Sequence, residues 1–161
     1  MSTFVAQRVT RSHVIQLPAI LQQVFPLFEP LGEKLWEVDW NPDMLYPVTG
    51  EAEVGTTFTT RHANEPTKIW TIVAYEREQS HVTYLNILPQ SHTSWIDVRC
   101  QQAEEQTSRV CVTYTLTALS PQGNALLATF TQQHYQTWIS SWQQAITHYL
   151  LHGQLLPHNQ E

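Results

Sequence analysis

The sequence predicts an α+β domain in which an antiparallel sheet packs against one long helix near the C-terminal end. Three features support this fold class: a strand-like segment opens the chain, five more strand-like segments with short polar turns fill its middle, and a helical pattern begins after residue 124. Two short helical segments bounded by prolines follow the first strand. Because most α+β domains do not isolate their longest helix at the end, this order narrows the choice of fold.

Length and composition predict a single globular domain spanning residues 1–161. Hydrophobic residues make up 42% of the chain and charged residues 14%, which provides enough apolar material for one core. The net charge of −6 and the lack of a basic cluster argue against nucleic acid as a partner. No apolar run resembles a signal peptide or reaches the ~18 residues of a membrane span, so we expect a cytoplasmic protein with no stable membrane insertion.

The first segments are predicted from prolines as much as from periodicity. Residues 3–16 mix β-branched and polar side chains, which is typical of a strand. A proline suited to a first helical turn opens the helix predicted over residues 18–28, and Pro26 should cut that helix short. A second brief helix is expected over residues 30–36, and a loop over residues 38–53.

The middle of the chain reads as an antiparallel meander. Its five strands are predicted over residues 53–60, 67–75, 81–88, 94–101 and 108–119. The register that we infer pairs Val73 with Tyr84, Tyr84 with Ile96, and Ile96 with Tyr114. This register gathers apolar side chains on one face of the sheet and leaves a partly solvated face opposite.

Some large apolar side chains do not fit this register, because it places them on the outer face. They are Trp70, Ile72, Leu85, Ile87 and Trp95. Either that half of the sheet is covered, or a bulge shifts its register. A homodimer that uses this patch is a hypothesis.

One amphipathic helix is predicted from about residue 125 to Leu151, before Gly153 and Pro157 end it. An unbroken helix of this length would be roughly 40 Å long at 1.5 Å per residue. Its apolar stripe consists of Leu127, Phe130, Trp138, Trp142, Ala145 and Tyr149. The apolar stripe of this helix should therefore pack on the apolar face of the sheet, as in the helix-grip fold.

The order of elements and three segments of the chain resemble the START/polyketide-cyclase-like superfamily, also called SRPBCC. The segments are "VFPLFEPLGEKLW..DWNP" at 24–42, "TIVAYE" at 71–76 and "VTYTLTALSPQGN" at 112–124. The first segment is similar to a bacterial subset of uncharacterised members. The resemblance covers nearly the whole chain and implies a curved sheet wrapped around the long helix, with a ligand cavity between them. It includes no catalytic signature.

The resemblance places Trp36 and Trp40 at the rim of this cavity. We interpret the two rings as ligand contacts that gate the cavity. The alternative is that both rings close one end of the core beneath a long loop, which large aromatic side chains do efficiently. Both roles are compatible, because a ring that plugs an apolar cavity also contacts its occupant.

Polar side chains on the apolar sheet face are further candidates, because a cavity needs only a few directed hydrogen-bonding groups to orient a hydrophobic ligand. They are Thr71, Tyr84, Asn86, Ser94 and Tyr114. The alternative for each is a hydrogen bond to a neighbouring loop, a backbone carbonyl or solvent.

The predicted helix adds His134 and Trp138 to the candidate ligand-binding residues. His134 lies between Phe130 and Trp138 on the apolar stripe, so it would point toward the cavity and could act as an acid or base. A lone histidine on an apolar face is more often a satisfied core residue. Among the acids near residue 35, the four-residue spacing of Glu33 and Glu37 predicts a solvated surface.

Other chemistries find little support in the sequence. The eight histidines are scattered, which argues against a metal site. We expect no cofactor, because a glycine-rich phosphate loop and a nucleophile elbow are both absent from the sequence. Cys100 and Cys111 lie in adjacent predicted strands and are expected to be free thiols.

Two functions remain open. The first is binding of a small hydrophobic molecule or lipid in the cavity. The second is a polyketide cyclase- or dehydratase-like enzyme in which Tyr84, Tyr114 or His134 transfers protons, and the sequence assigns no catalytic residue. Interacting titratable groups deep in the cavity would favour the enzyme, whereas an apolar cavity with isolated hydroxyls would favour binding.

Overall fold

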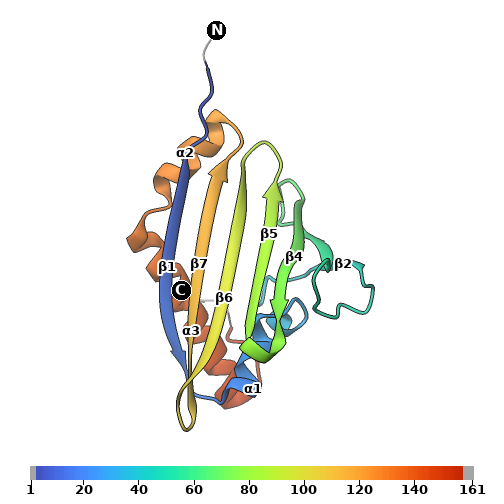
Figure 1. Ribbon diagram of the computed structural model, residues 1–161, viewed down its shortest axis with the longest axis vertical. Coiled ribbons are helices and arrows are strands. Elements are labelled where there is room, and N and C mark those ends of the chain that lie inside the picture. The colour runs from blue at the N-terminus through green and yellow to red at the C-terminus, as the bar shows by residue number, and fades with distance from the viewer. Residues whose placement is uncertain (1–2, 158–161) are drawn as a thin grey trace.

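The computed structural model describes residues 3–157 as a curved antiparallel sheet with helices packed on one face. The sheet has seven strands in the order β1-β7-β6-β5-β4-β3-β2. Figure 1 shows the long C-terminal helix α3 running along the sheet, with α2 at one end and α1 at the other. The predicted α+β class and the helix-grip arrangement are confirmed.

The first elements match the predicted order but are shorter than expected. Strand β1 (Arg8–Leu17) forms one edge of the sheet and pairs with β7. Helix α1 covers only Leu21–Val24 and continues as a 3-10 helix, η1 (Phe25–Phe28). A second 3-10 helix, η2, covers Gly32–Leu35. The two short helical segments after the first strand are thus confirmed, and Pro26, within the first turn of η1, lies where the α-helix ends.

The expectation of a plain loop over residues 38–53 is wrong, because this segment contains strand β2 (Asp43–Tyr46). Strand β2 pairs with β3 (Thr57–Thr60) and forms the second edge of the sheet. The four residues of β2 lie between two prolines. A strand this short is defined by its pairing with β3, which leaves almost no periodic signal in the sequence.

The four central strands confirm most of the predicted register. They are β4 (Lys68–Glu76), β5 (His81–Leu88), β6 (His92–Glu104) and β7 (Thr107–Ala118), with a short 3-10 helix, η3 (Arg77–Gln79), between β4 and β5. The pairs Tyr84–Ile96 and Ile96–Tyr114 are present. The pair Val73–Tyr84 is wrong: Ile72 pairs with Tyr84, and the register shifts between Ile72 and Ala74.

This register shift determines which of the apolar residues predicted on the outer face are buried in the core. Trp70 and Ile72 face inward and are buried, whereas Trp95 lies on the outer face with 47% of its surface exposed. Only Leu85, Ile87 and Trp95 of the five residues stay on the outer face. Because two of the five side chains face the core, the outer-face patch available to a homodimer is smaller than expected.

The C-terminal helix is broken, contrary to the prediction of one continuous helix. Helix α2 (Pro121–Thr129) ends at Phe130, whose φ and ψ of −86° and 65° are not helical, and α3 covers Gln132–His152. The Thr131 hydroxyl accepts a hydrogen bond from the His134 backbone N–H, and this capping interaction starts the second helix. Gly153, with φ of 69°, ends α3 as predicted.

The core lies between the inner face of the sheet and α3. The residues of α3 that are buried are Tyr135, Ile139, Trp142 and Ile146. Of the predicted stripe on α3, Trp142 is buried, whereas Trp138, Ala145 and Tyr149 are partly buried. None of the helices within residues 3–157 is both long and apolar enough to cross a bilayer.

Both cysteines are free thiols, as predicted. Cys100 pairs with Val110 and faces the core, whereas Cys111 is the partner of Arg99 and faces outward. The two side chains therefore lie on opposite faces of the sheet, and a bridge between them is excluded.

Candidate ligand cavity between the sheet and the C-terminal helices

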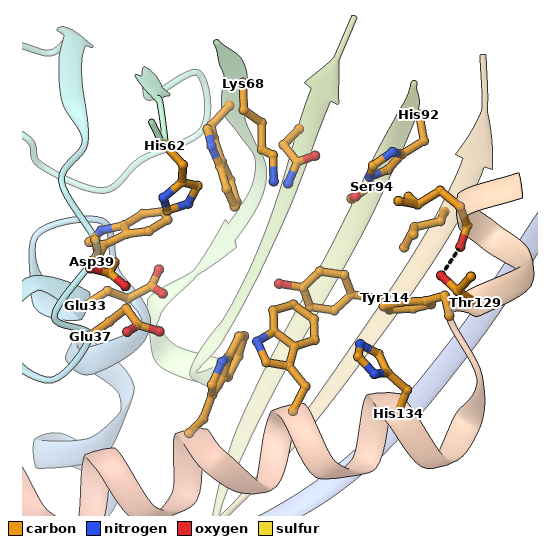
Figure 2. Close-up of a pocket in the computed structure, with 18 residues that line it drawn as sticks. Glu33, Glu37, Asp39, His62, Lys68, His92, Ser94, Tyr114, Thr129 and His134 are labelled. Carbon is orange, nitrogen blue, oxygen red and sulfur yellow. Dashed lines mark hydrogen bonds between the residues drawn. The ribbon is translucent and has the colours of Figure 1, made fainter. Parts of the chain in front are cut away.

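A cavity of about 400 Å³ lies between the inner face of the sheet and the helices α2 and α3. Strands β4 to β7 form one wall and α3 forms another, while the segment around η2 forms a third, as Figure 2 shows. The cavity lies toward the α2 end of the sheet, because Leu126 and Thr129 of α2 also line it.

The strand register gathers polar side chains on the inner face at this end. One row across β4, β5, β6 and β7 consists of Trp70, Asn86, Ser94 and Leu116, and we call it the cavity row. Lys68 and His92 lie on the same face two residues closer to α2. The cavity row and these two residues therefore provide the hydrogen-bonding groups of the sheet wall.

Aromatic rings form the apolar surface of the cavity. The Tyr114 ring lies edge-on to Trp138, with centroids 4.9 Å apart, and Trp138 lies 5.3 Å from Trp142. On the opposite side the Trp40 ring lies edge-on to Trp70 at 5.2 Å. Rings in these orientations suit the binding of a flat apolar molecule.

Asn86 is the most unusual polar residue of the cavity. It is only 2% exposed, and its Oδ1 is a buried side-chain oxygen that lacks a hydrogen-bond partner within residues 3–157. Leaving a buried acceptor unpaired costs about 1–3 kcal/mol. A bound molecule with an N–H or O–H group would relieve this cost.

The expectation that Glu33 and Glu37 form a solvated surface is wrong, because both line the cavity. The 3-10 turn η2 tucks this segment beneath the sheet, and Figure 2 shows Glu33, Glu37 and Asp39 together on one wall. Burial raises the pKa of Glu33 well above its usual range, and the neighbouring Glu37 charge adds to this effect. Glu33 has no side-chain hydrogen bond to another described residue, so its carboxyl group is open to the cavity.

The Tyr114 hydroxyl is a second group without a hydrogen bond in the part of the chain that the structure describes. It points into the cavity in Figure 2. Burial raises its pKa well above the usual range, with smaller contributions from Tyr135, Glu33 and Glu37. The hydroxyl is therefore a neutral donor that a ligand or substrate can use.

The opposite end of the cavity carries Lys68 and His92. Burial lowers the pKa of Lys68, and the charge of Glu65 only partly opposes this effect. Burial also lowers the pKa of His92, helped by the positive charge of Lys68. The Nδ1 atom of His92 is hydrogen-bonded to the Ser91 hydroxyl at 2.7 Å, which fixes the ring.

Five of the eight predicted ligand-binding residues lie around the cavity. They are Trp40, Asn86, Tyr114, His134 and Trp138. Trp40 is held by a hydrogen bond of 2.7 Å from its indole N–H to the Pro30 carbonyl. His134 is exposed on α3 and stands at the edge of the cavity, as Figure 2 shows.

The other three predicted residues do not line this cavity. Trp36 is 2% exposed, donates a hydrogen bond of 2.8 Å to the Leu27 carbonyl and packs on Trp142, so it closes the core as the alternative interpretation held. Tyr84 lies in the next row of the sheet, and its hydroxyl donates to the Phe28 carbonyl at 2.6 Å. Thr71 lies on the outer face, because the β4 bulge reverses the assumed register.

The cavity residues that were missed from the sequence include Glu33, Lys68 and His92. A signal existed for Lys68, which shares the two-residue period of the inward-facing Trp70 and Ile72 and so breaks an apolar pattern. Glu33 gave no such signal, because its position depends on how η2 packs beneath the sheet. No group of three or more His, Cys, Asp or Glu side chains within residues 3–157 is arranged to hold a metal ion.

Comparisons with known proteins show the fold. No family model and no curated protein matches the sequence. Norcoclaurine synthase from Thalictrum flavum is 11% identical, with 94% of this chain and 99% of that chain covered and a TM-score of 0.68. A hypothetical protein from Helicobacter pylori is 10% identical, with 88% and 87% covered and a TM-score of 0.70. The protein Ara h 8.0201 is 15% identical, with 90% and 99% covered and a TM-score of 0.63.

These similarities extend over nearly the whole of each compared chain. The protein therefore has the fold of these compared proteins, a curved antiparallel sheet packed against a long C-terminal helix. At these identities the likeness concerns the fold, and the chemistry of the cavity must be argued from this chain's own residues.

Proposed function

We propose that the protein binds a small hydrophobic molecule with an aromatic body in the cavity between the sheet and the C-terminal helices. The observation that carries the proposal is the unpartnered Asn86 Oδ1 within an aromatic cavity. A buried acceptor of this kind is costly to leave unpaired in a structural core, and its presence is explained if a ligand donates to it.

Size and polarity support the proposal. Small-molecule sites are about 300–1,000 Å³, mainly apolar, and carry a few polar groups that fix orientation. The cavity of about 400 Å³ falls in this range. Its polar groups lie at two ends, with Lys68 and Asn86 on the sheet and Glu33 on the facing wall, so an elongated ligand would bind in one orientation.

The second candidate function is an acid–base enzyme that uses the same cavity. The observation that favours it is Glu33, whose pKa is raised by burial and by Glu37, since interacting titratable groups deep in a cavity are suited to proton transfer. The fold supports an enzyme in at least one other protein, because one of the compared structures is named as a synthase.

Glu33 and Tyr114 suit proton transfer better than two of the residues predicted from the sequence. The Tyr84 hydroxyl is occupied by the Phe28 carbonyl, and His134 is exposed at the cavity edge. By contrast, neither the Glu33 carboxyl nor the Tyr114 hydroxyl has a hydrogen-bond partner among the described residues. In this second function Glu33 is the proton donor and Tyr114 orients the substrate.

The binding proposal is tested by titrating the protein with 1-naphthol in an isothermal calorimeter. We expect Trp138→Leu to weaken binding at least about tenfold, equivalent to about 1.4 kcal/mol, because it removes a wall of the cavity. Trp95→Leu is the matched control, since Trp95 lies on the outer face. Equal effects of the two substitutions, or no saturable binding to either, would contradict the proposal.

A cytoplasmic location and a homodimer are proposals that rest on the sequence. The homodimer would use the outer-face residues Leu85, Ile87 and Trp95. Sedimentation at tens of micromolar, a concentration suited to weak association, tests it. A monomer at that concentration would count against the dimer and leave the cavity proposal unaffected.

A further inference from the structure

Strand β4 begins inside the cavity with a lysine. Lys68 pairs with Thr60 of β3 and precedes Trp70 by two residues, so both side chains project from the inner face. Figure 2 shows Lys68 pointing from β4 into the cavity. The only other lysine of the sequence, Lys34, is exposed on η2.

No described carboxylate forms an ion pair with Lys68. The ion pairs within residues 3–157 join His81 and Arg99 to acids on the outer face. The Lys68 ammonium instead lies over the Trp70 ring, 5.8 Å from its centroid. Because burial lowers its pKa, Lys68 holds a larger fraction of neutral amine than an exposed lysine does. A neutral amine is a nucleophile, and desolvation is one way in which proteins activate lysine.

Two groups near Lys68 suit the chemistry of an amine and a carbonyl. Asn86 pairs with Trp70, which makes it a diagonal neighbour of Lys68 on the same face. Its unpartnered Oδ1 can accept a hydrogen bond from an O–H or N–H group formed at the lysine nitrogen. On the facing wall, Glu33 supplies a carboxylic acid in the same cavity.

We propose that Lys68 is a nucleophile that forms an imine with an aldehyde or ketone bearing an aromatic body. The inference rests on the proposed function, because the aromatic body must occupy the cavity. The Lys68 amine attacks the carbonyl carbon, and a proton moves from nitrogen to oxygen to give a carbinolamine. Glu33 then donates its proton to the carbinolamine hydroxyl, which leaves as water while the nitrogen lone pair forms the C=N bond. The products are a protonated imine on Lys68, one water and the Glu33 carboxylate.

The competing role for Lys68 is an ion pair with an anionic ligand. That role requires the ammonium form, which burial disfavours at this position. The charge of Glu65 opposes this effect only in part, and no described carboxylate forms an ion pair with Lys68. Burial therefore increases the fraction of the neutral amine at this position.

The presence of only two lysines makes the inference testable within one molecule. The protein is incubated with 2-naphthaldehyde and sodium cyanoborohydride near neutral pH, and the modified residues are identified by peptide mass spectrometry. We expect a naphthylmethyl group to be added to Lys68 faster than to Lys34, because burial lowers the pKa of Lys68 and so raises its fraction of neutral amine. Equal rates on the two lysines would overturn the inference.

Matched variants separate this inference from the binding proposal. Lys68→Arg keeps a cation but forms no imine, whereas Lys34→Arg is the control on the exposed lysine. 2-Naphthalenemethanol has the aromatic body without the carbonyl, so it should bind the wild type and Lys34→Arg. If the alcohol binds but Lys68 is not modified, only the imine is refuted. If the alcohol fails to bind the wild type, the cavity proposal and the imine are both refuted.

The anionic probe 2-naphthoate addresses the competing role directly. We expect it to bind no more tightly than 2-naphthalenemethanol, because burial disfavours the ammonium form that an ion pair requires. Tighter binding of the naphthoate that is kept in Lys68→Arg and lost in Lys68→Met would identify Lys68 as an anion-binding residue and overturn its role as a nucleophile.

Discussion

The two ends of the inner sheet face are built from the same strands but have opposite characters. At the end near α1, a row of Val82, Val98 and Val112 is buried to 2% exposure or less, and we call this end the closed end. Its buried polar groups are satisfied: the Tyr135 hydroxyl donates to the Val112 carbonyl, and the Ser108 hydroxyl donates to the Ala19 carbonyl at 2.8 Å. Near α2, in the cavity row, the same strands β5 and β6 carry Asn86 and Ser94 instead of valines.

The difference shows that the polar groups that cost folding stability lie at the cavity end of the sheet. At the cavity end, Asn86 Oδ1, the Glu33 carboxyl and the Tyr114 hydroxyl have no partner among residues 3–157. A single inward-facing row, Tyr84, Ile96 and Tyr114, lies between the cavity row and the valine row of the closed end, whose polar atoms are paired. Unsatisfied groups gathered at one end of an otherwise well-packed core are typical of a site where function opposes stability.

The largest expected effect comes from truncating a helix residue at the closed end. Ile146 is fully buried in the later turns of α3, which lie near α1 in Figure 1. Ile146→Ala should lower the free energy of unfolding by about 2–5 kcal/mol, because it leaves a cavity in a packed core. Leu126→Ala, at the rim of the existing cavity, should cost below about 1 kcal/mol. Urea denaturation of both variants tests this contrast, and equal losses would contradict it.

A pair of polar and apolar exchanges should change stability in opposite directions at the two ends. Val98→Thr introduces a hydroxyl without a partner at the closed end and should destabilise the protein by about 1–3 kcal/mol. Asn86→Leu removes an acceptor that is already unpaired, so it should be neutral or stabilising in the ligand-free protein. Thermal unfolding compares the two, and a large loss of stability in Asn86→Leu would show that the amide is a structural residue.

The ionisation of Glu33 should make the cavity end sensitive to pH. The folded state raises the pKa of Glu33 above its ordinary value of 4.5, so the folded protein binds this proton more tightly than the unfolded chain. The stability this provides is complete below the unfolded pKa and is lost as pH rises through the folded pKa, at about 1.4 kcal/mol per unit of elevation.

Glu33→Gln should therefore match the wild type near pH 4 and be more stable near pH 8, where the wild type carries the buried charge. Chemical denaturation at a series of pH values measures the difference. Glu53→Gln is a suitable control, because Glu53 is exposed and lies away from the cavity. A constant difference across the pH range would refute the assignment of Glu33 as a buried acid.

The smallest expected effect is a difference in reactivity between the two thiols. Burial at the core face raises the pKa of Cys100 to about 12, whereas Cys111 is partly exposed on the outer face. A maleimide should label Cys111 in the native protein and Cys100 only after unfolding, since the thiolate is the reactive form. Rapid labelling of both thiols in the native state would show that the core is open at Cys100.

The sequence predicted the parts of the fold that repeat over many residues. The five middle strands and the C-terminal helical region each carry a sustained period, and the order of elements defined the fold class. Local irregularities were missed because they depend on tertiary contacts. The bulge after Ile72 moved Trp70 and Ile72 to the core and Thr71 outside, and the cap at Thr131 divided the helix.

The site was predictable only where a residue was unusual for its surroundings. Asn86 and Tyr114 stood out as polar groups on an apolar face and lie at the cavity. Trp36 and Trp40 looked alike, yet one indole closes the core and the other faces the cavity, because the chain turns between Glu37 and Trp40. Glu33 looked like a surface acid, since its burial comes from the packing of η2 against the sheet.

The most direct measurement is an NMR titration of protein labelled with nitrogen-15 in its six tryptophans. Four of the indole N–H groups belong to residues that line the cavity, namely Trp40, Trp70, Trp138 and Trp142. On addition of 1-naphthol, we expect the signals of these four residues to shift, and the signal of Trp95 on the outer face to stay fixed. A shift confined to Trp95, or no saturable shift at any indole, would contradict a ligand cavity between the sheet and the C-terminal helices.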